Sequence, residues 1–242
     1  MYVPAACPTQ ARLQFRPTCM NSRAVLLATT AFLLVACGGS STGSTTHATP
    51  TTAAAALSLL DGSAMKDAKC VQTGLSNTSI ASGNITGTCR ISKTGSTYSL
   101  LQQYSVTVTA QVETTSRTVT SYAVSLLVGG DTYYRTGQNP SSGSYAHSTV
   151  APAHTWSELF FAGANFSNLQ QTTVNGTAAW TVDATTPGLV GVSKTGKLYI
   201  RSSDGYLMEV DYLNTSGATT LRTKFGFTAW DTGTPVSATP PQ

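Results

Sequence analysis

The chain has 242 residues, of which only 10% are charged, and it carries 14 Lys and Arg against 10 Asp and Glu. Three of the arginines, Arg12, Arg16 and Arg23, precede residue 37, so their removal leaves 11 basic against 10 acidic residues. This near-neutral balance argues against nucleic acid or any other polyphosphate partner.

The N-terminal region has the pattern of a secretion signal. Arg23 precedes a 13-residue apolar run from Ala24 to Ala36, and Cys37 follows. The run is well short of the ~20 residues that a membrane-spanning helix needs. Residues 1–36 are therefore predicted to be a signal region. Translation is expected to start at Met20, because the residues before it contain no apolar run.

The segment Leu34-Val35-Ala36-Cys37 resembles the lipobox of bacterial lipoproteins. That resemblance implies cleavage before Cys37, a diacylglycerol on its thiol, and acylation of the new N-terminus by a chain such as palmitate. The protein would then be held on the extracytoplasmic face of the cell membrane. Residues 37–53 are rich in Gly, Ser, Thr, Ala and Pro, which predicts a disordered tether. Residues 54–242 are long enough for one domain.

Two cysteines remain in that domain, Cys70 and Cys89. In an oxidising compartment two such thiols more often pair than stay free. A turn near Ser79 and Ile80 would place them opposite each other on antiparallel strands, so we predict a disulfide.

The domain is predicted to begin with an amphipathic helix and to continue as β-structure. Apolar residues recur at helical spacing from Leu57 to Ala68. Further on, apolar and polar residues alternate, which is typical of half-buried strands joined in an antiparallel meander. The alternating segments are 104–113, 122–128, 206–213 and 221–229. Gly129 and Gly130 predict a tight turn.

One further helix is predicted in mid-chain. Thr155 and Glu158 form a capping box, and Trp156, Leu159 and Phe160 follow at helical spacing, with Gly163 placed to end the helix. The Ser-, Gly- and Pro-rich residues 138–153 are predicted to form a long loop. A β-meander with two helices indicates an α+β fold.

The chain resembles the LppX/LprAFG-type lipoproteins and, more distantly, the LolA/LolB-like carriers. The matching segments are 65–68, 84–91, 131–135, 174–180 and 227–236. The resemblance implies a curved antiparallel half-barrel with helices packed on its concave face. It also implies an apolar cavity that takes up lipid or a lipidated molecule without catalysis, in a monomer. The side chains expected to line it are Tyr104, Tyr122, Val124, Trp156, Leu159 and Phe160.

Two alternatives stay open. The first is an envelope module with a packed core that recognises a protein or a glycan. The second is a small hydrolase, which is less favoured because no nucleophile and base can be paired. Ser63 and Lys66 match S-x-x-K, but the two Lys-Thr-Gly segments, 93–95 and 194–196, are better explained as hairpin turns.

No metal or cofactor is expected. His147 and His154 flank the long loop without a Cys, Asp or Glu at ligand spacing, so surface positions are predicted for both. Asp131, Asp204 and Asp231 lie in turn sequences, where a carboxylate satisfies nearby backbone groups.

Overall fold

The computed structural model describes residues 48–78, 81–112, 115–187 and 192–240. The predicted signal region, Cys37 and most of the predicted tether lie outside these residues. Two helices are described, α1 (Ala53–Asp61) and α2 (Trp156–Phe161). Neither of these two helices is long and apolar enough to cross a membrane.

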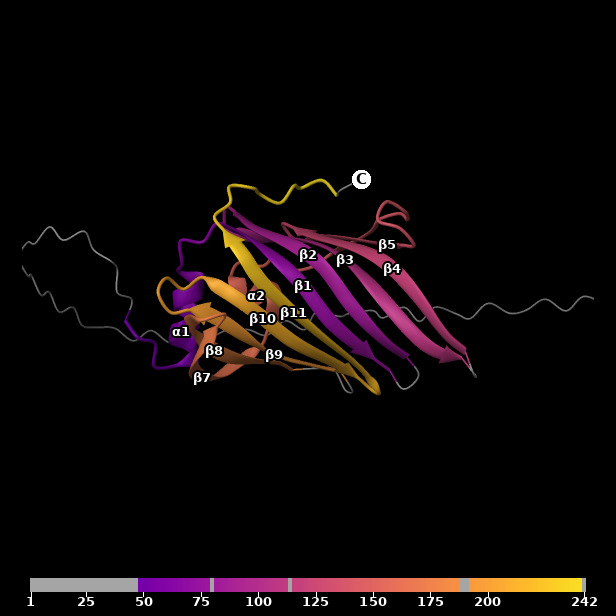
Figure 1. Ribbon diagram of the computed structural model, residues 1–242. Helices are drawn as coiled ribbons and strands as arrows, with labels where there is room; N and C mark the ends of the chain where they lie inside the picture. Colours follow the sequence, from indigo (N-terminus) through magenta and orange to yellow (C-terminus); the bar gives the residue numbers. More distant parts are fainter. Residues whose placement is uncertain (1–47, 79–80, 113–114, 188–191, 241–242) are drawn as a thin grey trace, which may run out of the picture. The chain divides into compact units, whose positions relative to one another are not determined.

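Eleven strands form one antiparallel sheet in the described part of the chain, in the order β6-β5-β4-β3-β2-β1-β11-β10-β9-β8-β7 (Figure 1). The strands are β1 (Asp67–Asn77), β2 (Ala81–Thr94), β3 (Thr97–Val112), β4 (Thr115–Val128), β5 (Asp131–Gly137), β6 (Ala146–Thr149), β7 (Asn165–Val174), β8 (Thr177–Thr186), β9 (Val192–Arg201), β10 (Leu207–Ser216) and β11 (Thr219–Trp230). Two meanders, β1–β6 and β7–β11, are joined where the first strand pairs with the last. The predicted antiparallel sheet is thus confirmed.

The sheet has a largely buried face and a more exposed face, although parts of the second are also covered, as at Leu126, which is 1% exposed. Successive side chains of a strand point to opposite faces, whereas partners directly opposite each other point to the same face. We call the face that carries Ile91, Val182 and Phe225 the inner face, since these side chains are at most 1% exposed. The opposite, outer face carries Val71, which is 46% exposed, and Arg222.

The contacts of α2 require the sheet to bend. This six-residue helix contacts both β3 and β8, which are separated in the sheet by five other strands. In a flat sheet those two strands would be roughly 29 Å apart, whereas a six-residue helix is only ~9 Å long. The sheet therefore curves between β3 and β8. Figure 1 shows the strands β1–β4 continuing beyond both helices.

Three local predictions are wrong. The first helix ends at Asp61 rather than near Ala68, because Gly62 caps it and β1 begins at Asp67. The predicted loop contains the short strand β6. The second Lys-Thr-Gly segment, 194–196, lies inside β9 instead of at a turn. The first copy does form a turn, with Gly95 at φ 61° between β2 and β3.

The capping box is confirmed. Thr155 is the N-cap of α2, and its hydroxyl accepts a hydrogen bond from the Glu158 N–H at 3.0 Å. The helix ends at Phe161, two residues before Gly163, which has φ 70°. The start of the mid-chain helix was thus predicted correctly, and its end was predicted to within two residues.

The Cys70–Cys89 disulfide is present. The two residues are direct partners in the pairing of β1 with β2, and their Cα atoms are 4.9 Å apart. Both cysteines are buried among the apolar residues of the inner face. Ser79 and Ile80, where a turn was predicted, lie outside the described residues, but β1 ends just before them and β2 begins just after.

Candidate functional site

At the end of the inner face where β3 begins, α2 fills the space above the sheet. Trp156 is 0% exposed, and its ring centroid lies 4.8 Å from that of Tyr98 on β3. Phe160 is also buried, with its ring centroid 5.4 Å from that of Phe225 on β11. Leu159 packs against the same cluster while remaining partly exposed. These side chains form a packed core at this end.

The two helices are linked by a carboxylate. Asp61, the last residue of α1, accepts a hydrogen bond from the Trp156 backbone N–H at 3.0 Å. Burial raises the pKa of Asp61, and burial together with the Asp61 charge raises the pKa of Tyr98 to about 12. Both groups thus have structural neighbours that explain their shifts, and no catalytic role is needed to account for them.

A lysine marks the end of this packed region. Lys194 lies on the inner face of β9, and its Nζ donates a hydrogen bond to the Phe160 carbonyl at the end of α2. The ammonium is 4.6 Å from the ring centroid of Tyr212 and 5.0 Å from that of Phe161. Burial lowers the pKa of Lys194 to about 8. Among the described residues, no carboxylate forms an ion pair with it.

Lys194 was not among the residues predicted from the sequence, but a signal was present. From 194 to 200 the residues of β9 that point inward are Lys194, Gly196, Leu198 and Ile200. A lysine at an apolar position of an alternating strand marks a buried charge. The turn-like sequence Ser-Lys-Thr-Gly concealed this alternation.

Hydroxyl and amide groups surround the same region. Burial and interaction with the Tyr134 hydroxyl raise the pKa of Tyr104, and Tyr212 is close enough to contribute electrostatically. Burial also raises the pKa of Tyr212, whose hydroxyl interacts with Thr223. Gln72 is 4% exposed, and its Oε1 has no hydrogen-bond partner in the structure. The inner face therefore holds several polar groups next to its apolar core.

Beyond these polar groups the inner face is apolar but open. Val106 and Val108 of β3 are half-buried, and Val119, the partner of Val108 on β4, is 60% exposed. Exposed β-branched residues on the face that elsewhere forms the core leave apolar surface in contact with water.

The two faces differ in charge. The carboxylates of the described strands β8–β10 all point outward, and each is paired: Asp183 with Lys197, Glu209 with Lys224, and Asp211 with Arg222. By register, the charged side chains on the inner face are cations: Lys93, Arg117 and Lys194. The charged strand residues of the inner face are therefore all cationic, whereas the outer face carries paired charges of both signs.

The residues expected to line a cavity do not all lie together. Tyr104 is on the inner face, where its partner on β4 is Ala123. Tyr122 and Val124, on either side of Ala123, therefore point outward. They line an outer pocket of about 310 Å³ together with Pro140, and Tyr104 also borders it. Trp156, Leu159 and Phe160 belong to the packed core described above.

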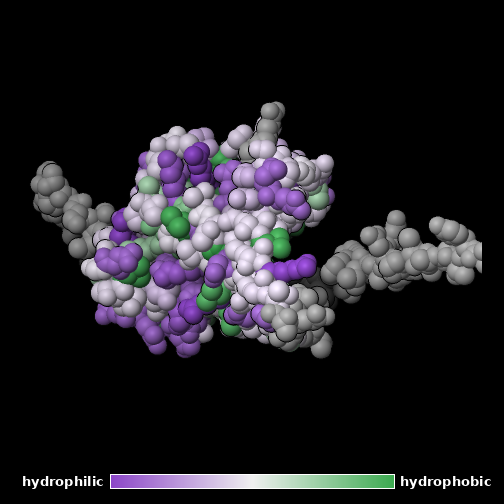
Figure 2. All heavy atoms as spheres, turned by 45° about the vertical axis from the view of Figure 1, so that its right-hand side comes forward, coloured by the Kyte–Doolittle hydropathy of each residue, from purple (hydrophilic) through white to green (hydrophobic). Residues whose placement is uncertain are grey.

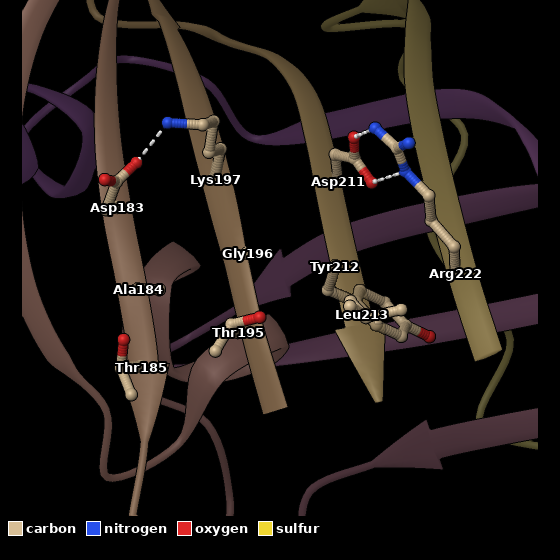
Figure 3. A pocket seen from close by; sticks show the side chains of 10 residues that line it. All are labelled: Asp183, Ala184, Thr185, Thr195, Gly196, Lys197, Asp211, Tyr212, Leu213 and Arg222. Carbon is tan, nitrogen blue, oxygen red and sulfur yellow. Dashed lines mark hydrogen bonds and ion pairs between the residues drawn. The ribbon is translucent and has the colours of Figure 1, made fainter. Parts of the chain in front are cut away.

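A shallow groove crosses the outer face of β8–β11 (Figure 3). Its volume is about 380 Å³, and Figure 3 shows the Lys197–Asp183 and Arg222–Asp211 pairs at its rim. A second groove of about 550 Å³ shares Asp211 and Arg222 with it. The charged groups at the rim are paired with each other, and the Arg222 side chain is 65% exposed.

Surface colouring agrees with a weakly polar exterior. In the view of Figure 2, hydrophobic side chains form small separate patches among neutral and hydrophilic ones. No large apolar interface is visible on that side.

Residues that could bind a metal ion are not clustered in the described part of the chain. No cluster of three or more His, Cys, Asp or Glu occurs among them. Ser63 lies after the end of α1 rather than on a helix with Lys66. His147 is exposed and its Nε2 is 2.9 Å from Asp131, a surface pairing.

No family model and no curated protein matches the sequence. Solved structures similar to this chain include the following three, each at 9–10% identity. A DUF1329 family protein from Desulfovibrio piger covers 75% of this chain and 94% of its own, at a TM-score of 0.36 and 9% identity. A LolA superfamily protein from Nitrosomonas europaea covers 73% and 92%, at a TM-score of 0.30 and 9% identity. A domain described as an outer membrane lipoprotein-sorting protein, from Vibrio parahaemolyticus, covers 70% and 87%, at 0.31 and 10% identity. At these TM-scores the similarities do not establish a family.

Proposed function

We propose that this protein is an extracytoplasmic lipoprotein that binds an apolar ligand, lipid or lipidated, as a carrier without catalysis. The observation that carries the proposal is the open apolar part of the inner face, where Val119 is 60% exposed on the face that elsewhere forms the core. In this proposal the sheet is a LolA-like half-barrel and both helices occupy its concave side. The bend of the sheet around α2 supports that arrangement.

The ligand would bind by passive burial. Each acyl CH₂ group removed from water contributes about 0.8 kcal/mol, so a single chain lying on Val106, Val108 and Val119 can bind appreciably. Tyr104 would border this surface. Trp156 and Phe160 would form its packed end and would not touch the chain, because they are already buried.

A titration with a fluorescent fatty acyl probe tests the proposal. The wild type is expected to bind saturably, and Val119→Glu to weaken binding strongly because it puts a charge on the apolar surface. Val71→Glu is the matched control, since Val71 is an exposed valine on the outer face of the same sheet. Equal weakening by both variants, or no saturable binding by the wild type, contradicts the proposal.

Anchoring through Cys37 is the second part of the proposal, and the lipobox supports it. Cys37→Ser is expected to move the protein from the membrane fraction to the soluble extracytoplasmic fraction. Retention on membranes through detergent-free washing would contradict an acyl anchor.

A module that recognises a glycan or a protein is the alternative, and the two connected outer grooves favour it. It predicts a flat acyl-probe titration together with ligand binding that is lost in Arg222→Ala. Retained acyl binding in that variant favours the carrier.

A further inference from the structure

The position of Lys194 bears on which ligand the inner face takes. Strand register places Lys194 in one row that runs across seven neighbouring strands, from β9 to β4. The row consists of Lys194, Asn214, Leu221, Ser76, Gly83, Val108 and Val119. One end of this row is a cation and the other end is exposed apolar surface.

The side chains in the middle of the row are small. Gly83 has no side chain and Ser76 has a short one, and Gly83 is itself buried. Val108 leans over Gly83, where a Cβ atom would lie 3.1 Å from Val108 Cγ2. A flexible chain that runs from the lysine toward Val119 would pass over the Val108 side chain rather than touch the Gly83 backbone.

The surroundings of Lys194 favour an anion. Its ammonium lies against two aromatic rings and one carbonyl, and no described carboxylate offsets its charge. Tyr212, whose ring lies against the ammonium, carries a hydroxyl group, and Tyr104 is close enough to Tyr212 to interact with it electrostatically. A partly buried cation without a counterion, bordered by donors, is complementary to a negatively charged group.

We infer that the ligand is an acidic amphiphile whose carboxylate or phosphate headgroup binds Lys194 Nζ while its acyl chain lies along the row toward Val119. This inference rests on the proposed carrier function and narrows its ligand class. The simpler role of Lys194 is structural, as the group that caps the end of α2 through the Phe160 carbonyl. A structural role affects all ligands alike, whereas headgroup binding affects only charged ones.

The experiment compares three fluorescent probes with the same long chain: a free fatty acid, the corresponding alkyl phosphate, and the methyl ester of the acid. Titrations at pH 7 keep the lysine protonated. Wild type is expected to bind at least one of the anionic probes about tenfold to a hundredfold more tightly than the ester. The probe with the greater preference identifies the headgroup as carboxylate or phosphate.

Lys194→Met is expected to lower anionic binding to the level of the ester and to leave ester binding unchanged. Lys194→Gln, which keeps a donor for the Phe160 carbonyl, is expected to do the same and serves if the Met variant does not fold. Lys197→Met is the matched control on the outer face of the same strand, and it is expected to keep the preference.

A wild type that binds acid, phosphate and ester equally overturns the inference while leaving the carrier function intact. Equal weakening of all three probes by Lys194→Gln also overturns it and assigns the lysine a structural role. Absence of binding by every probe overturns the carrier function and the inference with it.

Discussion

The two ends of the inner face are built from the same strands and differ in what covers them. At the end occupied by α2, Trp156 and Phe160 exclude water from β3 and β11. At the other end, Val108 and Val119 continue the same apolar stripes without a helix above them. Lys194 lies between the two regions.

This difference shows that an apolar stripe on a strand does not by itself define a core. The stripe makes a surface that excludes water only where another element packs on it. In this sheet α2 is too short to cover strands of up to 16 residues. The uncovered remainder is therefore the part available for binding, and stability measurements can separate the two ends.

The largest effect is expected at the covered end. Trp156→Ala should lower the free energy of unfolding by about 3–5 kcal/mol, because it empties a fully buried site. Denaturant unfolding followed by circular dichroism measures the change. A loss below about 1 kcal/mol would mean that this end is not packed as described.

The disulfide is expected to contribute the next largest effect, also at the covered end. Replacing both Cys70 and Cys89 by Ala should cost about 3 kcal/mol, since the bond closes a loop of roughly 20 residues. Labelling of the denatured, unreduced wild-type domain should detect no free thiol at these positions. Detection of two thiols there would contradict the bond.

A pH-dependent effect is expected at the boundary. The folded-state pKa of Lys194 is lowered from 10.5 to about 8, so between these values the unfolded chain binds more protons. The stability of the wild type should therefore rise with pH in this range, whereas Lys194→Met lacks this titration. The stability of the variant relative to wild type should fall by about 1–2 kcal/mol between about pH 7.5 and about pH 9.5.

The raised pKa values of Tyr98 and Tyr104 act equally in both proteins and cancel in that difference. A difference that stays constant with pH would show that burial does not depress the lysine. Parallel urea titrations of both proteins across the pH range measure it.

The smallest effect is expected at the open end. Val119→Ala should change the free energy of unfolding by only about 0.5 kcal/mol, because the side chain is 60% exposed. Thermal unfolding of this variant beside Trp156→Ala measures the contrast. A loss as large as that of Trp156→Ala would remove the distinction between the two ends.

Local signals predicted many of the elements. The Thr155 capping box located the start of α2, and alternation located β3, β4, β10 and β11. The first helix was predicted too long, because Met65 and Ala68 continue the helical spacing although Gly62 ends the helix. Their burial comes instead from packing in the core as the chain enters β1.

The candidate site was less predictable because it depends on register. Tyr104 and Tyr122 each belong to an apolar stripe of a strand. The sequence alone does not determine whether the two stripes lie on the same face of the sheet. The pairing of Val112 with Thr115 sets the β3–β4 register and sends the two tyrosines to opposite faces. Lys194 was missed for another reason. The composition of its neighbours suggested a turn, but Gly196 is a strand residue that makes room for α2, since a Cβ atom there would lie 2.6 Å from the Phe161 ring.

The edge strands of this open sheet bear on self-association. β6 has only four residues, and β7 is interrupted between Ser167 and Gln170, where Asn168 adopts φ 53°. The Asn168 side chain donates to Asp183 Oδ2 at 3.0 Å, which ties the irregular segment to β8. A strand from a second copy would find only short or interrupted rows of backbone groups along β6 and β7. These two strands thus act against edge-to-edge pairing along β6 and β7.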